Sequence, residues 1–130
     1  FRSEGTIKKK ILLVDDEAAI TRIMRRNLEA TGRFEVIDVN DPEKALDTAR
    51  SFRPDLILLD VMMPEMDGGE VAAQIEADST LSSIPIIFLT AIVSRNEVEP
   101  TGSTIGSHKF LAKPVKLEDL LVCLDEQLGQ

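Results

Sequence analysis

Short aliphatic runs alternate along the chain with longer amphipathic segments. Four large aliphatic residues in a row, from Leu56 to Leu59, indicate a strand buried on both faces, as the inner strands of parallel sheets are. Three other aliphatic runs are similar, and one further segment alternates as a more exposed strand does. The five predicted strands are 10–14, 34–39, 56–59, 85–89 and 108–112.

The segments between these runs have apolar residues at the three-to-four-residue spacing of an amphipathic helix. Asp41 with Pro42 is a helix start, Gly32 is a helix stop, and Asp67 with Gly68 forms a turn. Residues 92–107 are interrupted by Gly and Pro, so we expect at most a turn or two there, near 94–98. The predicted helices are 17–30, 42–52, 69–78 and 116–128.

Strands that alternate with helices imply a parallel sheet, because each parallel pair needs a crossover connection. The fold class is therefore α/β: a flavodoxin-like, doubly wound, five-stranded parallel sheet in the order 2-1-3-4-5. Helices are expected on both faces, with a short or irregular fourth helix. In this order strands 1 and 3 flank the topological switch point, where such sheets bind their ligands.

The composition fits one soluble domain. The chain has 130 residues, of which 43% are hydrophobic, and no apolar run is long enough to span a bilayer. A formal charge of −8 disfavours direct nucleic acid binding, and the single cysteine, Cys123, suits a reducing cytoplasm. Residues 1–7 have no periodicity and start without Met, so we expect a leader or expression remnant followed by one domain over 8–130.

Three carboxylates follow predicted strands at the switch point. Asp15 and Asp16 end the first strand, and Asp60 ends the third. One such residue could equally be a helix cap, which contributes about 0.5 to 2 kcal/mol. Carboxylates about 5 Å apart, however, repel by roughly 3 kcal/mol per pair at an effective dielectric of about 20. Capping does not explain such a cluster, whereas Mg²⁺, which takes carboxylate oxygens and bridges to phosphate, does.

With that metal in place, an oxygen of Asp60 could attack phosphorus and form an acyl phosphate. Lys113 and Thr90, at the ends of the other two strands, would donate to the phosphoryl oxygens. Taken singly, a Thr at a strand end is usually structural and a Lys before Pro is usually solvated. The prediction rests on all five residues reaching one edge of the sheet.

The motifs that carry these residues resemble the receiver domain of two-component response regulators. The resemblance covers about residues 8–128 and is specific in order and spacing. The matching motifs are Val14-Asp15-Asp16-Glu17, Leu59-Asp60-Val61-Met62-Met63-Pro64, Asp67-Gly68, Thr90-Ala91 and Lys113-Pro114.

This resemblance implies that Asp60 accepts phosphate from the phosphohistidine of a histidine kinase or phosphotransfer protein, or from a small phosphodonor. It also implies that Asp15, Asp16, Asp60 and the backbone carbonyl of Met62 hold Mg²⁺. Such a domain is a signalling module that catalyses only its own phosphorylation and dephosphorylation. Its downstream partner or output domain is not readable from this sequence.

The resemblance further implies a switch pair, Thr90 and Phe110. Phosphorylation would draw Thr90 inward and vacate space for the Phe110 ring, although a fixed core aromatic is the alternative interpretation of Phe110. Gly68 and a cis Lys113-Pro114 peptide would be structural. His108 is interpreted as a surface residue, not a second phosphoacceptor.

The sequence departs from the family in its irregular segment 92–107, which replaces an amphipathic helix of the usual signalling face. This departure argues against the symmetric dimer that many DNA-binding regulators form through that face. One alternative is a receiver-like binding module that signals without regulated phosphorylation. Another, a haloacid dehalogenase-like phosphatase, is disfavoured because that family has its nucleophile on the first strand, whereas Asp60 ends the third.

Overall fold

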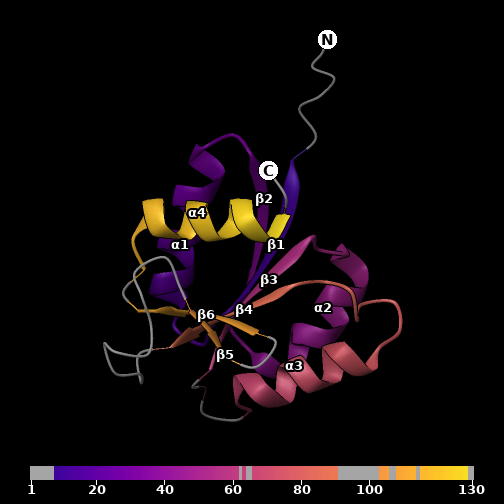
Figure 1. The fold of residues 1–130 in the computed structure, drawn as a ribbon. Helices are drawn as coiled ribbons and strands as arrows, with labels where there is room; N and C mark the ends of the chain where they lie inside the picture. The colour runs from indigo at the N-terminus through magenta and orange to yellow at the C-terminus, as the bar shows by residue number, and fades with distance from the viewer. Residues whose placement is uncertain are drawn as a thin grey trace.

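The fold is a single sheet between two layers of helices (Figure 1). The computed structural model of the chain describes residues 8–61, 63, 66–90, 103–105, 108–113 and 115–128. In chain order its elements are β1 (Lys9–Val14), α1 (Ala18–Ala30), β2 (Phe34–Val39), the 3₁₀ turn η1 (Pro42–Lys44), α2 (Ala45–Phe52), β3 (Leu56–Asp60), α3 (Gly68–Ala77), β4 (Ile86–Thr90), β5 (Ser103–Ile105), β6 (His108–Ala112) and α4 (Leu117–Leu128).

The sheet has the strand order β2-β1-β3-β4-β6-β5. The first five strands of this list are parallel and correspond to the five predicted strands, so the predicted order 2-1-3-4-5 is confirmed. The three-residue strand β5 adds an antiparallel edge beside β6. Strand β5 was not predicted from the sequence, because a strand of this length in a Gly- and Ser-rich segment has no hydrophobic periodicity.

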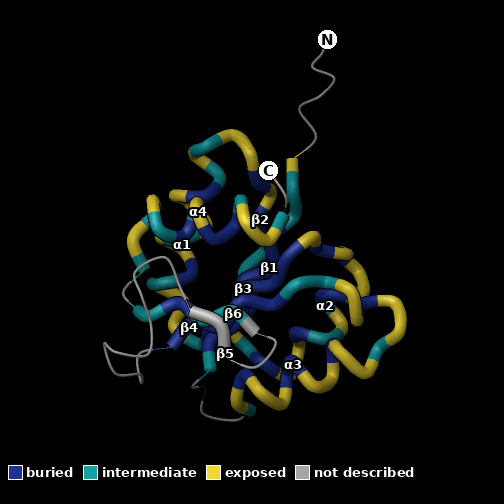
Figure 2. Tube along the Cα trace, in the orientation of Figure 1, coloured by how far each residue is buried: buried dark blue, intermediate teal, exposed yellow. Residues whose placement is uncertain are grey.

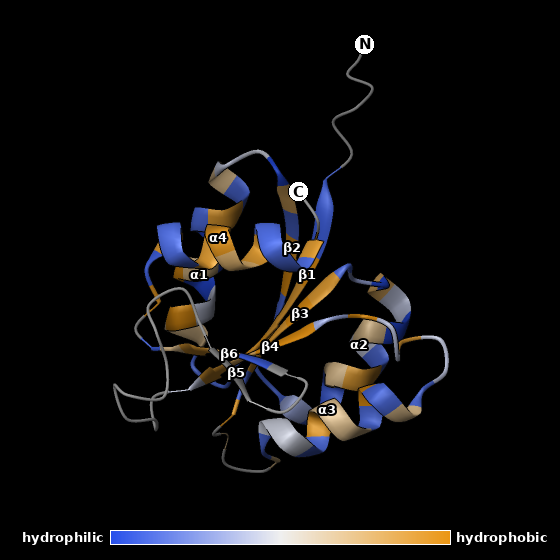
Figure 3. Ribbon diagram, in the orientation of Figure 1, coloured by the Kyte–Doolittle hydropathy of each residue, from blue (hydrophilic) through white to orange (hydrophobic). Residues whose placement is uncertain are grey.

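The central strands are buried on both faces because each face of the sheet is covered by two helices (Figure 2). Along β3, Ile57 and Leu59 contact the core on the side of α2 and α3, whereas Leu56 and Leu58 contact the core on the side of α1 and α4. The same alternation occurs in β1 and β4. Figure 3 shows the result as apolar strands in the centre and polar residues on the outward sides of the helices.

The predicted helix boundaries hold with small shifts. Asp41 caps the segment that begins at Pro42, because its side chain accepts a hydrogen bond from the Glu43 backbone N–H, but the first turn is 3₁₀ and not α-helical. Gly32 has φ +77°, a backbone conformation that favours glycine, and follows α1 as predicted. The turn or two expected near 94–98 lies outside the described residues. Among the residues described, none of the helices is both long and apolar enough to cross a membrane.

Candidate functional site

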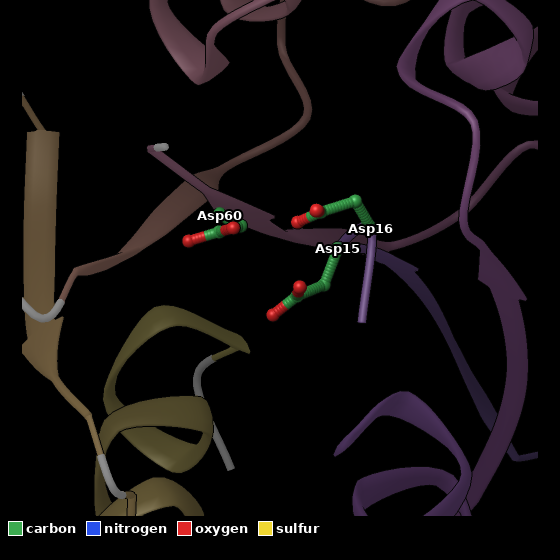
Figure 4. A group of neighbouring side chains, drawn as sticks. All are labelled: Asp15, Asp16 and Asp60. Atoms are coloured by element: carbon green, nitrogen blue, oxygen red, sulfur yellow. The ribbon is translucent and has the colours of Figure 1, made fainter. Parts of the chain in front are cut away.

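Three carboxylates gather at the carboxyl ends of β1 and β3 (Figure 4). Asp15 and Asp16 directly follow β1, and Asp60 is the last residue of β3. Because β1 and β3 are adjacent parallel strands, with Val14 beside Leu59, their ends meet at one edge of the sheet. One oxygen from each of the three residues lies within 4.8 Å of the others. The predicted convergence of these three residues is therefore present.

Two of these carboxylates are deeply buried. Asp15 is 0% exposed and Asp60 is 3% exposed, whereas Asp16 is half-buried. The backbone N–H of Glu17 donates to Oδ1 of Asp15 at 3.0 Å, which fixes that side chain at the start of α1. Buried carboxylates of this kind are costly unless they are paired or bind a cation.

Lys113 is the cation that compensates part of this charge. Its Nζ lies 2.7 Å from Oδ2 of Asp15 and 3.1 Å from Oδ1 of Asp60. Burial lowers the pKa of Lys113, but the hydrogen bonds to Asp15 and Asp60 and the negative charges of these carboxylates together raise it more, so the net shift of the pKa is upward and the ammonium stays charged. One ammonium group thus serves two buried carboxylates, with Asp16 beside them.

The position of Lys113 depends on the end of β4. The backbone N–H of Lys113 donates to the carbonyl of Thr90 at 2.9 Å, which continues the pairing of β4 and β6 by one step. Thr90 is itself 3% exposed. Lys113 and Thr90, both predicted from strand ends, are thereby brought to the same edge of the sheet as Asp60.

Gly68 allows the chain after β3 to pass close to Asp60. Its backbone N–H donates to the carbonyl of Val61 at 2.9 Å. A Cβ atom added at Gly68 would lie 2.4 Å from the backbone oxygen of Asp60, closer than real side chains approach. Asp67 caps the helix α3 that begins here, accepting from the Glu70 backbone N–H at 2.9 Å. A glycine is therefore required at position 68 by packing against Asp60.

Phe110 lies one strand away from the carboxylates, on β6. Its ring is half-buried and stacks on Phe88 of β4, with 5.1 Å between ring centroids and 25° between planes. It packs on the α2 and α3 side of the sheet. Thr90 is two residues after Phe88 on the same strand, so the two members of the predicted switch pair lie on one face of adjacent strands.

Three predicted residues lie wholly or partly outside the described residues. Met62 and Pro114 lie outside the described residues, so the backbone ligand and the cis peptide stay predictions. His108 begins β6, and its side chain is also outside the description.

Two residues near the site were not predicted. Glu17 has an oxygen 3.8 Å from Nζ of Lys113, and the Asn40 amide donates to the Asp15 carbonyl at 2.8 Å. Asn40 follows β2, so the strand-end rule that identified the other site residues would have found it too.

The donor set decides which metal suits this group. The group consists of carboxylate oxygens without a Cys or His ligand, which is the chemistry of a hard divalent cation. A cation would also relieve the repulsion among the three carboxylates, roughly 3 kcal/mol per pair at 5 Å. The three residues therefore form a group that can hold a metal ion.

A family model for the response regulator receiver domain matches residues 11–125 of the chain. The alkaline phosphatase synthesis transcriptional regulatory protein PhoP of Bacillus subtilis is 40% identical over 108 residues, which is 83% of this chain. The chain covers 43% of PhoP, so it spans less than half the length of that relative.

Two solved structures share the fold over nearly the whole chain. The chemotaxis protein CheY4 of Vibrio cholerae matches 94% of this chain and 100% of its own, with a TM-score of 0.80 and 33% identity. The receiver domain of the sensor histidine kinase PA1611 from Pseudomonas aeruginosa matches 95% of this chain and 100% of its own, with a TM-score of 0.79 and 30% identity. That structure has a magnesium ion coordinated in its active site cleft.

Proposed function

Because the chain belongs to the response regulator receiver domain family, we propose that Asp60 is its phosphoacceptor. The phosphoryl donor is the phosphohistidine of a histidine kinase or phosphotransfer protein, or a small phosphodonor. The observation that carries this proposal is the position of Lys113, whose Nζ contacts both Asp15 and Asp60. A carboxylate at the carboxyl end of a central strand, with an ammonium group 3.1 Å from its oxygen, suits attack on a phosphoryl group.

The chain's own residues have distinct tasks in this reaction. An oxygen of Asp60 attacks phosphorus, so that a carboxylate O–P bond forms while the bond from phosphorus to the donor nitrogen or oxygen breaks. The leaving group departs with that electron pair. Lys113 donates to a phosphoryl oxygen as charge develops, and the Thr90 hydroxyl donates to another. The reaction is the domain's own phosphorylation, and hydrolysis of the acyl phosphate returns Asp60 to the free carboxylate.

The proposed cofactor is Mg²⁺, held by Asp15, Asp16, Asp60 and the backbone carbonyl of Met62. Its contribution when bound is to neutralise the carboxylates and to bind the phosphoryl oxygens. The acidic donor set supports this proposal. The magnesium ion in the receiver domain of PA1611, a protein 30% identical to this chain, supports it further.

The proposed output is a shift between two conformations. Phosphorylation adds nearly two negative charges and new acceptors at Asp60, and Thr90 directly follows Leu89, the β4 residue that pairs with Asp60. Movement of Thr90 toward the phosphoryl group would open space on the face where the Phe110 ring lies. Since Phe110 is already stacked on Phe88, its rearrangement has to exchange that contact for another.

The proposed domain covers residues 8–130, and the family match lies inside it. We propose that it acts in the cytoplasm and signals to a protein partner or output domain. PhoP is a transcriptional regulatory protein. For the present chain, regulation of transcription would require a DNA-binding segment outside these residues, since its charge of −8 does not suit phosphate binding.

Intact-mass spectrometry after incubation with acetyl phosphate and Mg²⁺ tests the phosphoacceptor. We expect the wild type to gain one phosphoryl group and Asp60→Asn and Asp60→Ala to gain none. Asp55→Asn is the matched control, because Asp55 directly precedes β3 and Asp60 ends it. This control should gain the phosphoryl group as the wild type does.

Two outcomes would contradict the proposal: a wild type that gains no mass, or a gain that persists in Asp60→Ala. The first would favour a receiver-like binding module that signals without regulated phosphorylation. Beryllofluoride separates the cases further, because chemical shift changes at Thr90 and Phe110 on its addition report the switch without a covalent step.

A further inference from the structure

Asn40 connects the strand β2 to the backbone of the acidic site. It directly follows β2, and its Nδ2 donates to the carbonyl oxygen of Asp15 at 2.8 Å and to Oγ1 of Thr21 at 3.0 Å. The backbone N–H of Asp15 donates in turn to the carbonyl of Val39 at 3.1 Å. Both backbone groups of Asp15 are therefore held by the end of β2.

This contact constrains Asp16 as well. The carbonyl of Asp15 and the N–H of Asp16 belong to one planar peptide, so fixing that oxygen fixes the plane from which the Asp16 backbone continues. Asp16 has no hydrogen bond or ion pair within the part of the chain that the structure describes. Repulsion from Asp15 and Asp60 favours a backbone rotation that carries the Asp16 carboxylate away from them, and the hydrogen bond from Asn40 to the Asp15 carbonyl opposes rotation of this peptide.

Thr21 holds Asn40 from the other side. It is 0% exposed, and its Oγ1 accepts from Asn40 and lies 3.2 Å from Oδ2 of Asp38, to which it can donate. Oδ1 of Asp38 accepts from Nη1 of Arg25 at 2.9 Å. Although burial raises the pKa of Asp38, the hydrogen bond from Arg25 and those from its backbone and Thr21 lower it more, so the carboxylate is ionised at neutral pH.

These contacts form a chain of hydrogen bonds from α1 to the acidic site: Arg25, Asp38, Thr21, Asn40 and the Asp15 carbonyl. Asn40 must donate to the Asp15 carbonyl and to Thr21, because its amide nitrogen carries only hydrogens. Thr21 accepts from Asn40, and its single hydroxyl hydrogen can go to Asp38 or to the Ala18 carbonyl, which lies 3.1 Å away. Its outer end, at Arg25 and Asp38, lines a hollow on the surface.

We propose that Asn40 and Thr21 are positioning residues, which hold the Asp15–Asp16 peptide in the conformation that binds a divalent cation. Their effect is on the affinity of the acidic site for the cation, through the direction of Asp16. This inference rests on the proposed function in one respect only, that Mg²⁺ binds Asp15, Asp16 and Asp60. It does not require Asp60 to be phosphorylated.

Isothermal titration calorimetry of the purified chain with MgCl₂ at pH 7 measures the effect. Partners that orient metal ligands typically change metal affinity by 10- to 100-fold, so we expect Asn40→Ala to raise the dissociation constant by about tenfold. Thr21→Val replaces the hydroxyl with a methyl group and should raise the dissociation constant by about threefold, which is below that range because Asn40 remains. Thr21→Ser keeps the hydroxyl and should restore a value close to wild type.

Asn27→Ala is the matched control for Asn40→Ala. Asn27 is an exposed residue of α1 whose side chain has no hydrogen bond to the described residues, so this variant should bind Mg²⁺ as the wild type does. Far-UV circular dichroism and urea unfolding in EDTA establish that each variant is folded. If Asn40→Ala does not fold, the pair Thr21→Val and Thr21→Ser tests the same prediction.

A dissociation constant for Asn40→Ala that stays within the error of the wild-type value would overturn the proposal, whatever happens to stability. Equal constants for Thr21→Val and Thr21→Ser would also overturn it. A wild type that binds no Mg²⁺ overturns both this proposal and the proposed cofactor. A wild type that binds Mg²⁺ but gains no phosphoryl group contradicts only the phosphoacceptor, so the two failures are distinguishable.

Discussion

The two ends of the parallel strands handle charge in different ways. At the amino end, the carboxylates have separate partners: Asp55 accepts from the backbone N–H of Lys10 at 2.8 Å, and Asp78 accepts from Arg50 at 2.8 Å. Arg33, just before β2, pairs with Asp125 of α4. At the carboxyl end, Lys113 is shared by Asp15 and Asp60, and Asp16 and Glu17 lie close by.

The charges at the amino end stabilise the fold, whereas those at the carboxyl end form the candidate functional site. Exposed single pairs each contribute about 0 to 1 kcal/mol, and they need no further ligand. Among the described residues, three clustered carboxylates share the ammonium group of Lys113 at the carboxyl end, so their repulsion should lower stability until a cation binds. A protein retains such a cluster when function requires it. The following predictions test whether the two ends differ in this way.

Removal of Lys113 should have the largest effect on stability. Lys113→Met leaves Asp15 and Asp60 without their ammonium partner, and breaking a buried ion pair in this way costs about 3 kcal/mol or more. Urea unfolding in EDTA measures this loss, and Mg²⁺ should recover part of it. Lys109→Met is the matched control on β6, the strand that directly precedes Lys113. Lys109 Nζ lies 3.6 Å from Glu126, and its loss should cost about 1 kcal/mol or less. Equal losses in the two variants would contradict the comparison.

A methyl group at position 68 should have the next largest effect. The Cβ of Gly68→Ala would meet the Asp60 backbone oxygen at 2.4 Å, and overpacking of this kind costs about 1 to 3 kcal/mol. Gly69→Ala is its neighbour and control, since an added Cβ there meets the Asp67 side-chain oxygen, at 3.2 Å, and not the backbone of Asp60. Gly69 is the second residue of α3, where the preference of about 1 kcal/mol for Ala over Gly opposes this contact, so this control should change stability by less than Gly68→Ala does. Chemical denaturation compares the two variants.

Neutralising a carboxylate should change the free energy of unfolding in opposite directions at the two ends of β3. In EDTA, Asp60→Asn removes repulsion from the cluster and should stabilise the chain by about 1 kcal/mol, since each pair repels by roughly 3 kcal/mol but the contact with Lys113 is weakened. Asp55→Asn weakens a hydrogen bond to a charged group and should destabilise it by about 1 kcal/mol. Mg²⁺ should stabilise the wild type and Asp55→Asn according to its concentration over the dissociation constant, and Asp60→Asn less. Identical melting curves in EDTA and Mg²⁺ would show that the cluster binds no metal.

The smallest effect concerns Asp78 at the amino end. Hydrogen bonds from Thr80 and Arg50 lower the pKa of Asp78 from 3.8 to about 2. A depressed carboxyl pKa contributes stability that is present above pH 3.8 and is lost as the pH falls toward 2. An NMR titration of the Asp78 side chain measures the pKa, and Asp78→Asn should unfold with less pH dependence in this window. A pKa near 3.8 would contradict the prediction.

Most of the fold was predictable because its signals are local and repeated. The aliphatic run from Leu56 to Leu59 is long enough to be buried on both faces, and that burial indicates a parallel inner strand. The strand β5 was missed, because its pairing with β6 depends on a partner and not on a pattern of its own. The 3₁₀ turn at Pro42–Lys44 was missed for a similar reason, since its hydrogen bonding differs from an α-helix by only one residue of spacing.

The candidate site was predictable to the extent that it follows from topology. Asp15, Asp16, Asp60, Thr90 and Lys113 each follow or end a strand, and parallel strands bring their carboxyl ends to one edge. The same rule applies to Asn40, but this residue was not predicted as part of the site. Its bond to the Asp15 carbonyl requires the register of β1 beside β2, in which Val14 pairs with Val39.

The sequence by itself determined which groups reach the carboxyl edge, because hydrophobic periodicity sets the strands and strand direction sets the edge. It therefore determined the acidic cluster and the place of its lysine. Only the tertiary structure decided how these groups divide their contacts: Lys113 between Asp15 and Asp60, Phe110 against Phe88, and Asn40 between Asp15 and Thr21. Such contacts depend on differences of about 1 Å in distance and on hydrogen-bond direction, which residue spacing does not specify.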